Sequence, residues 1–93
     1  MKRVLLSVDG PYHLCLVPDI VADNLHKYIS DFDDYVWKYK MIKIDENHYR
    51  STVEEITGFI AWLNDKFSEQ SKIEKVLQDN EYEEYEQLES WNW

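Results

Sequence analysis

Glycine, cysteine and proline are scarce in this sequence of 93 residues. Its two glycines, Gly10 and Gly58, cannot supply either of the common glycine-rich loops that bind phosphate groups. Nucleotide hydrolysis and dinucleotide binding of the Rossmann type are therefore not expected, and we expect no bound cofactor. Cys15 is the only cysteine, so the chain cannot form an internal disulfide, whereas secreted domains of this size usually carry several. This favours a cytoplasmic protein.

Long apolar runs are also missing. No stretch approaches the roughly 20 apolar residues that a helix needs to cross a bilayer, and we expect no membrane segment. The apolar run that begins at Val4 breaks at Ser7 and Asp9. It is shorter than the apolar region of about 7–15 residues in a signal peptide, so no cleaved leader is predicted.

Apolar and aromatic side chains, by contrast, are plentiful. Hydrophobic residues make up 44% of the chain and aromatic residues 15%. Disordered chains lack such bulky groups, so we expect a folded core. The length fits one small acidic domain that spans residues 1–93.

The net charge of −9 is concentrated in the second half of the chain. Residues 1–50 carry seven basic and eight acidic side chains, whereas residues 51–93 carry three basic and eleven acidic ones. Such a field repels the phosphates of nucleic acids and attracts cationic surfaces. We therefore expect a basic protein partner and no direct binding of DNA or RNA.

The spacing of apolar residues predicts an α+β fold that starts with a β-hairpin. Residues 2–9 and 12–17 are rich in apolar, β-favouring side chains, and Asp9–Gly10–Pro11 between them is a turn signal. Apolar residues at helical spacing then predict one long amphipathic helix over residues 18–39, with Pro18 in its first turn. A strand starting near Tyr35 is the competing interpretation, because aromatic side chains alternate from there.

The second half of the chain predicts a short strand at residues 41–44 and a helix at residues 52–67. Ser51 and Glu54 have the spacing of a capping box at the start of that helix. Residues 73–77 suit a further helix. The segment after them stays open between a helix and a final strand, because its aromatic residues recur every three positions, off the helical period.

Two hypotheses about chemistry involve His13, Cys15 and His26. As metal ligands they are too few and too loosely spaced for a zinc site, so we expect no metal. As a catalytic thiol, Cys15 would need a nearby base and a lowered pKa, whereas its leucine neighbours predict an inert, packed side chain. We therefore expect a protein that is not an enzyme.

Two tryptophans fall outside the apolar stripes of the predicted helices. Trp37 and Trp62 both point away from the faces assigned to the core. Exposed tryptophan is enriched at binding hot spots, so both are candidates for a partner interface. The alternatives are that a sheet or the C-terminal segment covers them, or that the first helix ends before Trp37.

The C-terminal segment combines carboxylates with aromatic rings. A run of glutamates is usually a solvated surface, but this one also resembles the charge pattern of a nucleic-acid backbone and would suit a basic partner. Its candidate partner-binding residues are Glu81, Tyr82, Glu83, Glu84, Tyr85, Glu86, Glu89 and Trp91.

These features favour a small binding protein over an enzyme. The leading hypothesis is an inhibitor of immunity-protein or antitoxin type that neutralises a basic partner such as a nuclease. One alternative is a phage or mobile-element protein that mimics DNA and blocks a restriction or CRISPR enzyme. Another is a non-catalytic accessory protein that forms homo-oligomers, with Trp37 or Trp62 in a homodimer interface.

Overall fold

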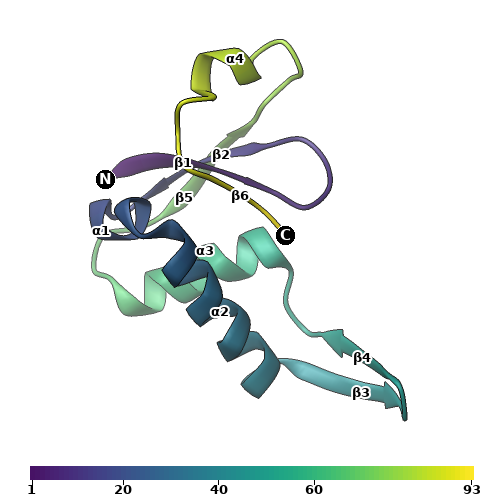
Figure 1. Cartoon of the computed structure of the whole chain (residues 1–93). Helices are drawn as coiled ribbons and strands as arrows, with labels where there is room; N and C mark the ends of the chain where they lie inside the picture. Colours follow the sequence, from purple (N-terminus) through teal and green to yellow (C-terminus); the bar gives the residue numbers. More distant parts are fainter.

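The computed structural model of the chain describes residues 1–93. The predicted hairpin lies at the centre of a four-stranded sheet. The fold is α+β, as expected (Figure 1). Its elements, in chain order, are β1 (Lys2–Ser7), β2 (His13–Val17), α1 (Asp19–Asp23), α2 (Leu25–Tyr39), β3 (Met41–Asp45), β4 (His48–Ser51), α3 (Glu55–Lys66), β5 (Lys72–Val76), α4 (Tyr82–Tyr85) and β6 (Ser90–Asn92).

The main sheet has the strand order β5-β2-β1-β6. β2 runs antiparallel to both β1 and β5, whereas β6 returns from the far end of the chain to pair parallel with β1. The turn between β1 and β2 contains Asp9 at φ 51°, a left-handed conformation that aspartate tolerates better than most residues. The Ser7 hydroxyl closes this turn by donating to the carbonyl of Gly10 at 2.8 Å.

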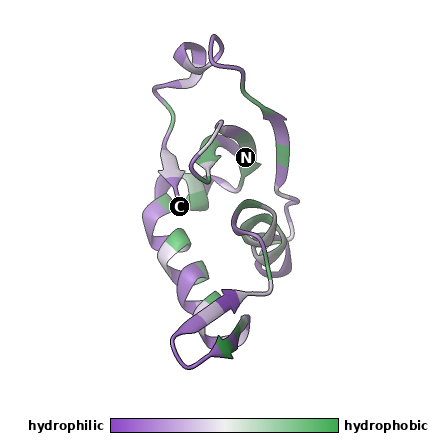
Figure 2. Cartoon of the chain, turned by 90° about the vertical axis from the view of Figure 1, so that its right-hand side faces the viewer, coloured by the Kyte–Doolittle hydropathy of each residue, from purple (hydrophilic) through white to green (hydrophobic).

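Strand alternation gives the sheet two buried faces. One face is covered by α1, α2 and α3, whose hydrophobic residues line the sheet side of the helices (Figure 2). On this face Val4 and Cys15 belong to the same core cluster as Phe32 and Phe59, whose rings meet edge to face at 5.5 Å. Burial of this cluster is the main stabilising contribution to the fold.

The opposite face of the sheet is covered by the C-terminal segment. Leu5 and Leu14 project to this side and pack with Leu77, and Tyr85 and Leu88 complete a second, smaller cluster. The segment containing α4 therefore crosses back over the sheet before β6 joins its edge (Figure 1).

The β3–β4 hairpin is the part of the molecule that leaves this body. It projects from the end of α2, and its two strands pair only with each other (Figure 1). The radius of gyration is 14.0 Å, whereas a globular chain of this length is expected near 12 Å. The extents of 45 × 31 × 18 Å fit a body elongated by this projection.

The helix predicted over residues 18–39 is interrupted at Asn24. Its backbone angles are φ −135° and ψ 42°, and its side-chain amide donates to the carbonyl of Ile20 at 2.9 Å. Short polar side chains compete with helical hydrogen bonding in this way. The competing strand near Tyr35 is wrong, since α2 continues to Tyr39.

The predicted capping box at Ser51 and Glu54 does not form. The Ser51 hydroxyl instead accepts from the N–H of Val53 at 3.1 Å and donates to the Val53 carbonyl at 2.7 Å. Ser51 belongs to β4, where it pairs with Met41, so α3 begins only at Glu55. The helix is consequently shorter than the predicted range of residues 52–67.

Residues 72–76 form a strand in place of the helix expected near residues 73–77. β5 occupies the open edge of β2, with Ile73 opposite Cys15 and Val76 opposite His13. Further along, the chain contains both of the structures left open by the sequence, the single-turn helix α4 and the strand β6. No helix has the length and apolar character required to cross a membrane.

Candidate functional site

The acidic cap, which we define as residues 79–89, is carried by α4 and its flanking turns. Tyr82 stacks on Tyr12 with ring centroids 5.3 Å apart, and this contact ties the cap to the start of β2. Tyr85, three residues after Tyr82, and Leu88, three residues further along, pack on the sheet. The three-residue recurrence of aromatic and apolar side chains therefore marks the side of the cap that faces the body.

The outward side of the cap is negatively charged. Six carboxylates and no basic residue lie in this segment. Only Glu81 forms an ion pair, with Lys75, and the backbone N–H of Gln78 also donates to it at 3.0 Å. Lys75 first, and then this N–H, hold the pKa of the Glu81 carboxyl below its ordinary value. The carboxylates without an ion pair are Asp79, Glu83, Glu84, Glu86 and Glu89.

A groove lies beside this charge. It has a volume of about 710 Å³ and runs between the β1–β2 turn and the start of the cap, with Pro11 and Leu77 among its lining residues. The stacked rings of Tyr12 and Tyr82 form part of its wall, and Asp79 contributes a carboxylate. The cap thus combines acidic side chains with an apolar recess, which suits an amphipathic cationic surface.

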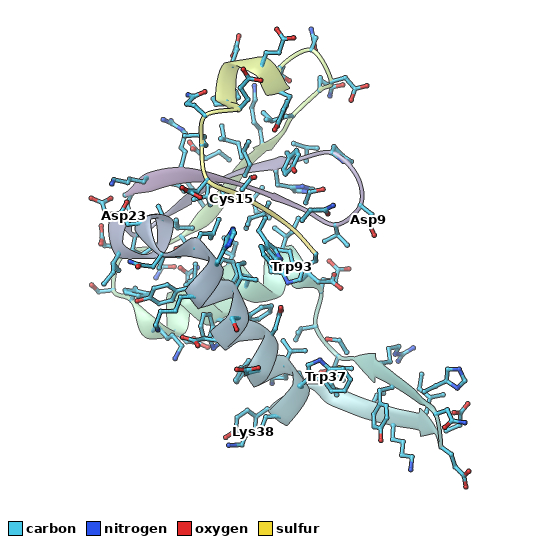
Figure 3. The ribbon with its side chains drawn as sticks, in the orientation of Figure 1. Asp9, Cys15, Asp23, Trp37, Lys38 and Trp93 are labelled. Atoms are coloured by element: carbon cyan, nitrogen blue, oxygen red, sulfur yellow. The ribbon has the colours of Figure 1, made fainter.

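Trp37 is exposed, as predicted, but lies far from the cap. Its side chain is 63% exposed and contacts Tyr49 of the β3–β4 hairpin, with ring centroids 6.0 Å apart. Figure 3 places Trp37 and Lys38 at the lower end of the molecule, whereas α4 lies at the upper end. Trp37 and the cap therefore do not form one continuous site.

The prediction that Trp62 points away from the core is wrong. Its ring is half-buried and packs against Phe32 at 5.7 Å and Phe59 at 6.0 Å, while the Lys66 ammonium lies 4.7 Å from its centre. α2 lies beside α3 and covers the flank of α3 that a single helical wheel assigns to solvent. Trp62 stabilises the contact between the two helices.

Trp91 lies on β6 rather than on the cap. It pairs with Leu6 in the sheet, and its half-buried ring meets His26 edge-on with centroids 5.1 Å apart. Its neighbour Trp93 donates its indole N–H to Asp33 at 3.0 Å and its backbone N–H to Ser7 at 2.9 Å. These tryptophans connect the C-terminal strand to the helices.

Cys15 is buried in the main core, which confirms the prediction of a packed cysteine. Burial, and to a smaller extent the Glu74 carboxylate, raises the pKa of the Cys15 thiol to about 12. The thiol therefore stays protonated at neutral pH. Its one polar contact is with the backbone carbonyl of His13 at 3.6 Å. Three or more potential ligands of a metal ion do not come together anywhere in the chain.

A second surface was missed by sequence reasoning. We call residues 37–51, the last turn of α2 with the β3–β4 hairpin, the arm. It carries half of the exposed large hydrophobic residues of the chain. The signal was available, because apolar and charged residues alternate from Ile42 to Asp45. They predict a strand, but they do not reveal that the strand would lie outside the main sheet.

Comparison with known proteins finds no relative of this chain. No family model matches it, and neither a curated protein nor a solved structure matches it.

Proposed function

We propose that this protein is a cytoplasmic, non-catalytic binding module that captures a basic protein partner through the acidic cap. The protein acts as an inhibitor, similar in role to an immunity protein or an antitoxin, and its target is a basic protein such as a nuclease. The observation that carries the proposal is the cap itself. It holds six carboxylates and no basic residue, and five of the carboxylates lack an ion pair.

Physical arguments support capture of a cationic surface. Unpaired carboxylates concentrated on one end of a protein attract a basic partner over several ångströms, speed encounter and discriminate against acidic competitors. Tyr82, which is 37% exposed, and the adjacent groove supply apolar area that a charged patch alone would lack. The anchoring of Tyr85 in the second cluster fixes the cap, which lowers the entropic cost of binding.

The experiment compares two variants with equal net charge. In the cap variant, Glu83, Glu84 and Glu86 become glutamine. In the control variant, three exposed acids that form no ion pair and lie elsewhere are neutralised as Asp34→Asn, Asp65→Asn and Glu69→Gln. Wild type and both variants are immobilised and used to capture proteins from native cells at increasing salt concentrations.

We expect the wild type and the control variant to retain the same basic protein, and the cap variant to release it at lower salt. A captured nuclease should lose activity when an equimolar amount of wild type is added, and should be less inhibited by the cap variant. Equal loss of binding in both variants would show that net charge alone matters. Binding that is unaffected by both salt and the cap variant would overturn the proposal.

A further inference from the structure

The groove beside the acidic cap is an apolar recess with a single charged group. Among its lining residues only Asp79 carries a charge, and the lining contains no base. Tyr82 and Val76 are exposed at its walls, and the buried Leu77 lies at its inner side. The volume of about 710 Å³ falls within the range of roughly 300–1,000 Å³ that is typical of binding pockets. The groove can therefore receive a whole side chain of another molecule.

Tyr82 offers a flat aromatic surface at the edge of this groove. Tyr12 stacks on one face of the ring, with an angle of 20° between the two ring planes. Because that face is covered, the exposed part of Tyr82 lies on the opposite face and at the ring edge. The faces of aromatic rings attract cations, and a planar cation can continue the stack of the two tyrosines.

Asp79 places a carboxylate beside this ring. It lies three residues before Tyr82, in a turn closed by the N–H of Glu81, which donates to the carbonyl of Gln78 at 2.9 Å. Asp79 forms no ion pair. Lys75 does not line the groove, and its charge is compensated by Glu81. The negative charge inside the groove is therefore available to a ligand.

This combination restricts what can occupy the groove. A neutral apolar group would take water away from the Asp79 carboxylate without replacing its hydrogen bonds, which costs free energy. An anion would be repelled by Asp79 and by the carboxylates of the cap. The occupant that fits carries a positive charge and also has apolar surface to place against the tyrosine ring.

We propose that the groove binds an arginine side chain of the basic protein partner, with the guanidinium stacked on Tyr82 and hydrogen-bonded to Asp79. The inference rests on the proposed function and names the side chain that the cap recognises. A guanidinium is planar and weakly hydrated, and it can donate two parallel hydrogen bonds to one carboxylate while it stacks on a ring.

Lysine fits the same groove less well. Its ammonium group is compact and strongly hydrated, and it cannot stack on a flat ring as a guanidinium does. The groove supplies one carboxylate, which would replace only part of the water around an ammonium. Arginine is also enriched at protein interfaces, whereas lysine is depleted there.

The first test uses free cations as probes. The protein, labelled with ¹⁵N, is titrated with n-propylguanidinium chloride and, separately, with n-butylammonium chloride at constant ionic strength. The guanidinium should cause saturable shifts of the backbone N–H signals of residues 76–82, and the ammonium should bind about threefold to tenfold more weakly. Equal binding of the two cations, or the absence of saturable shifts with the guanidinium, would overturn the proposal.

The second test removes the ring and the carboxylate in turn. Tyr82→Leu should raise the dissociation constant of n-propylguanidinium about threefold or more, whereas Tyr82→Phe should bind like wild type because the ring is kept. Asp79→Asn should raise this constant about fivefold, and Asp65→Asn, an equal change of charge outside the groove, about twofold or less. Circular dichroism verifies that each variant is folded. Equal effects of the two asparagine variants, or full binding by Tyr82→Leu, would refute the assigned contacts.

The third test returns to the protein partner. In the capture experiment described above, Tyr82→Leu and Asp79→Asn should release the basic protein at lower salt than wild type, and Tyr82→Phe should retain it like wild type. Capture that is weakened in the cap variant but not in these two variants would leave the proposed function standing and overturn the arginine site. Binding of the guanidinium probe by a wild type that captures no basic protein would refute the proposed function, and with it an arginine of the partner as the occupant.

Discussion

The acidic cap and the arm are two short segments attached to the same body. The cap buries apolar side chains and exposes charged ones, whereas the arm exposes its apolar side chains. The cap turns Tyr85 and Leu88 inward onto the sheet and its carboxylates outward. The arm turns Ile42 and Ile44 outward and has no anchor in either core cluster. A segment whose apolar groups are already buried needs no other molecule to cover them. A segment whose apolar groups remain exposed is stabilised further when another molecule covers them.

The largest difference between the two regions should be found in stability. Leu77 is buried beneath the cap beside Leu5 and Leu14, so Leu77→Ala should lower the free energy of unfolding by about 2–5 kcal/mol. Ile42→Ala in the arm should change it by about 0.5 kcal/mol or less under monomeric conditions. Urea denaturation at low protein concentration measures both. A similar cost for the two substitutions would mean that the arm belongs to the core.

A smaller but more local difference should be visible in tryptophan fluorescence. Trp37 is the most exposed of the four tryptophans, and Lys38 lies beside it in the arm. Iodide should quench it more strongly than caesium, because the charge of the arm is positive. Trp37→Phe should remove most of the iodide-sensitive emission, whereas Trp62→Phe should leave that emission in place. Stronger quenching by caesium would contradict the charge assigned to the arm.

The smallest expected effects concern one carboxyl in each region. At the tip of the arm, the backbone N–H of Asn47 and then the His48 ring hold the pKa of Asp45 below its ordinary value. In the cap, Lys75 has the same effect on the pKa of Glu81. A carboxyl with a lowered pKa in the folded state stabilises the fold above its unfolded pKa, about 3.9 for Asp and 4.3 for Glu. That stabilisation is lost as the pH falls through the folded value.

Carboxyl NMR titration should therefore give midpoints below these ordinary values for both residues. Lys75→Met should return the midpoint of Glu81 toward the ordinary value and leave that of Asp45 unchanged. An Asp45 midpoint that also moves would indicate coupling between the two ends of the molecule.

Local patterns were sufficient to predict the elements whose partners are close in sequence. The β1–β2 hairpin follows from two apolar runs around a turn at Asp9, and α3 follows from apolar residues at helical spacing. Asn24 could not be recognised as a helix break, because Val21 and Leu25 on either side of it face the same core. Gly58 lies inside α3, and a Cβ added there would come within 3.2–3.3 Å of the side chains of Phe32 and Val53, a close approach that the sequence of the helix alone does not reveal.

The misassigned parts depend on partners distant in sequence. Residues 72–76 form a strand because β2 has an open edge, and no pattern within Lys72–Val76 records that edge. Trp62 is covered because α2 lies against α3, which a single helical wheel does not describe. Among the candidate site residues, the cap could be predicted as a charged segment. The separation of the cap from Trp37 could not be predicted, because the folded chain as a whole sets the distance between these two segments.

The parallel pairing of β6 with β1 also affects how the protein is made. β1 leaves the ribosome before β6, and more than eighty residues separate the two strands. Throughout that interval the backbone groups on one edge of β1, including the N–H of Leu5 that finally donates to Glu89, have no partner. A nascent chain with such an edge can pair with other nascent chains. Slow translation or crowding of polysomes should therefore favour aggregation of this protein before β6 is synthesised.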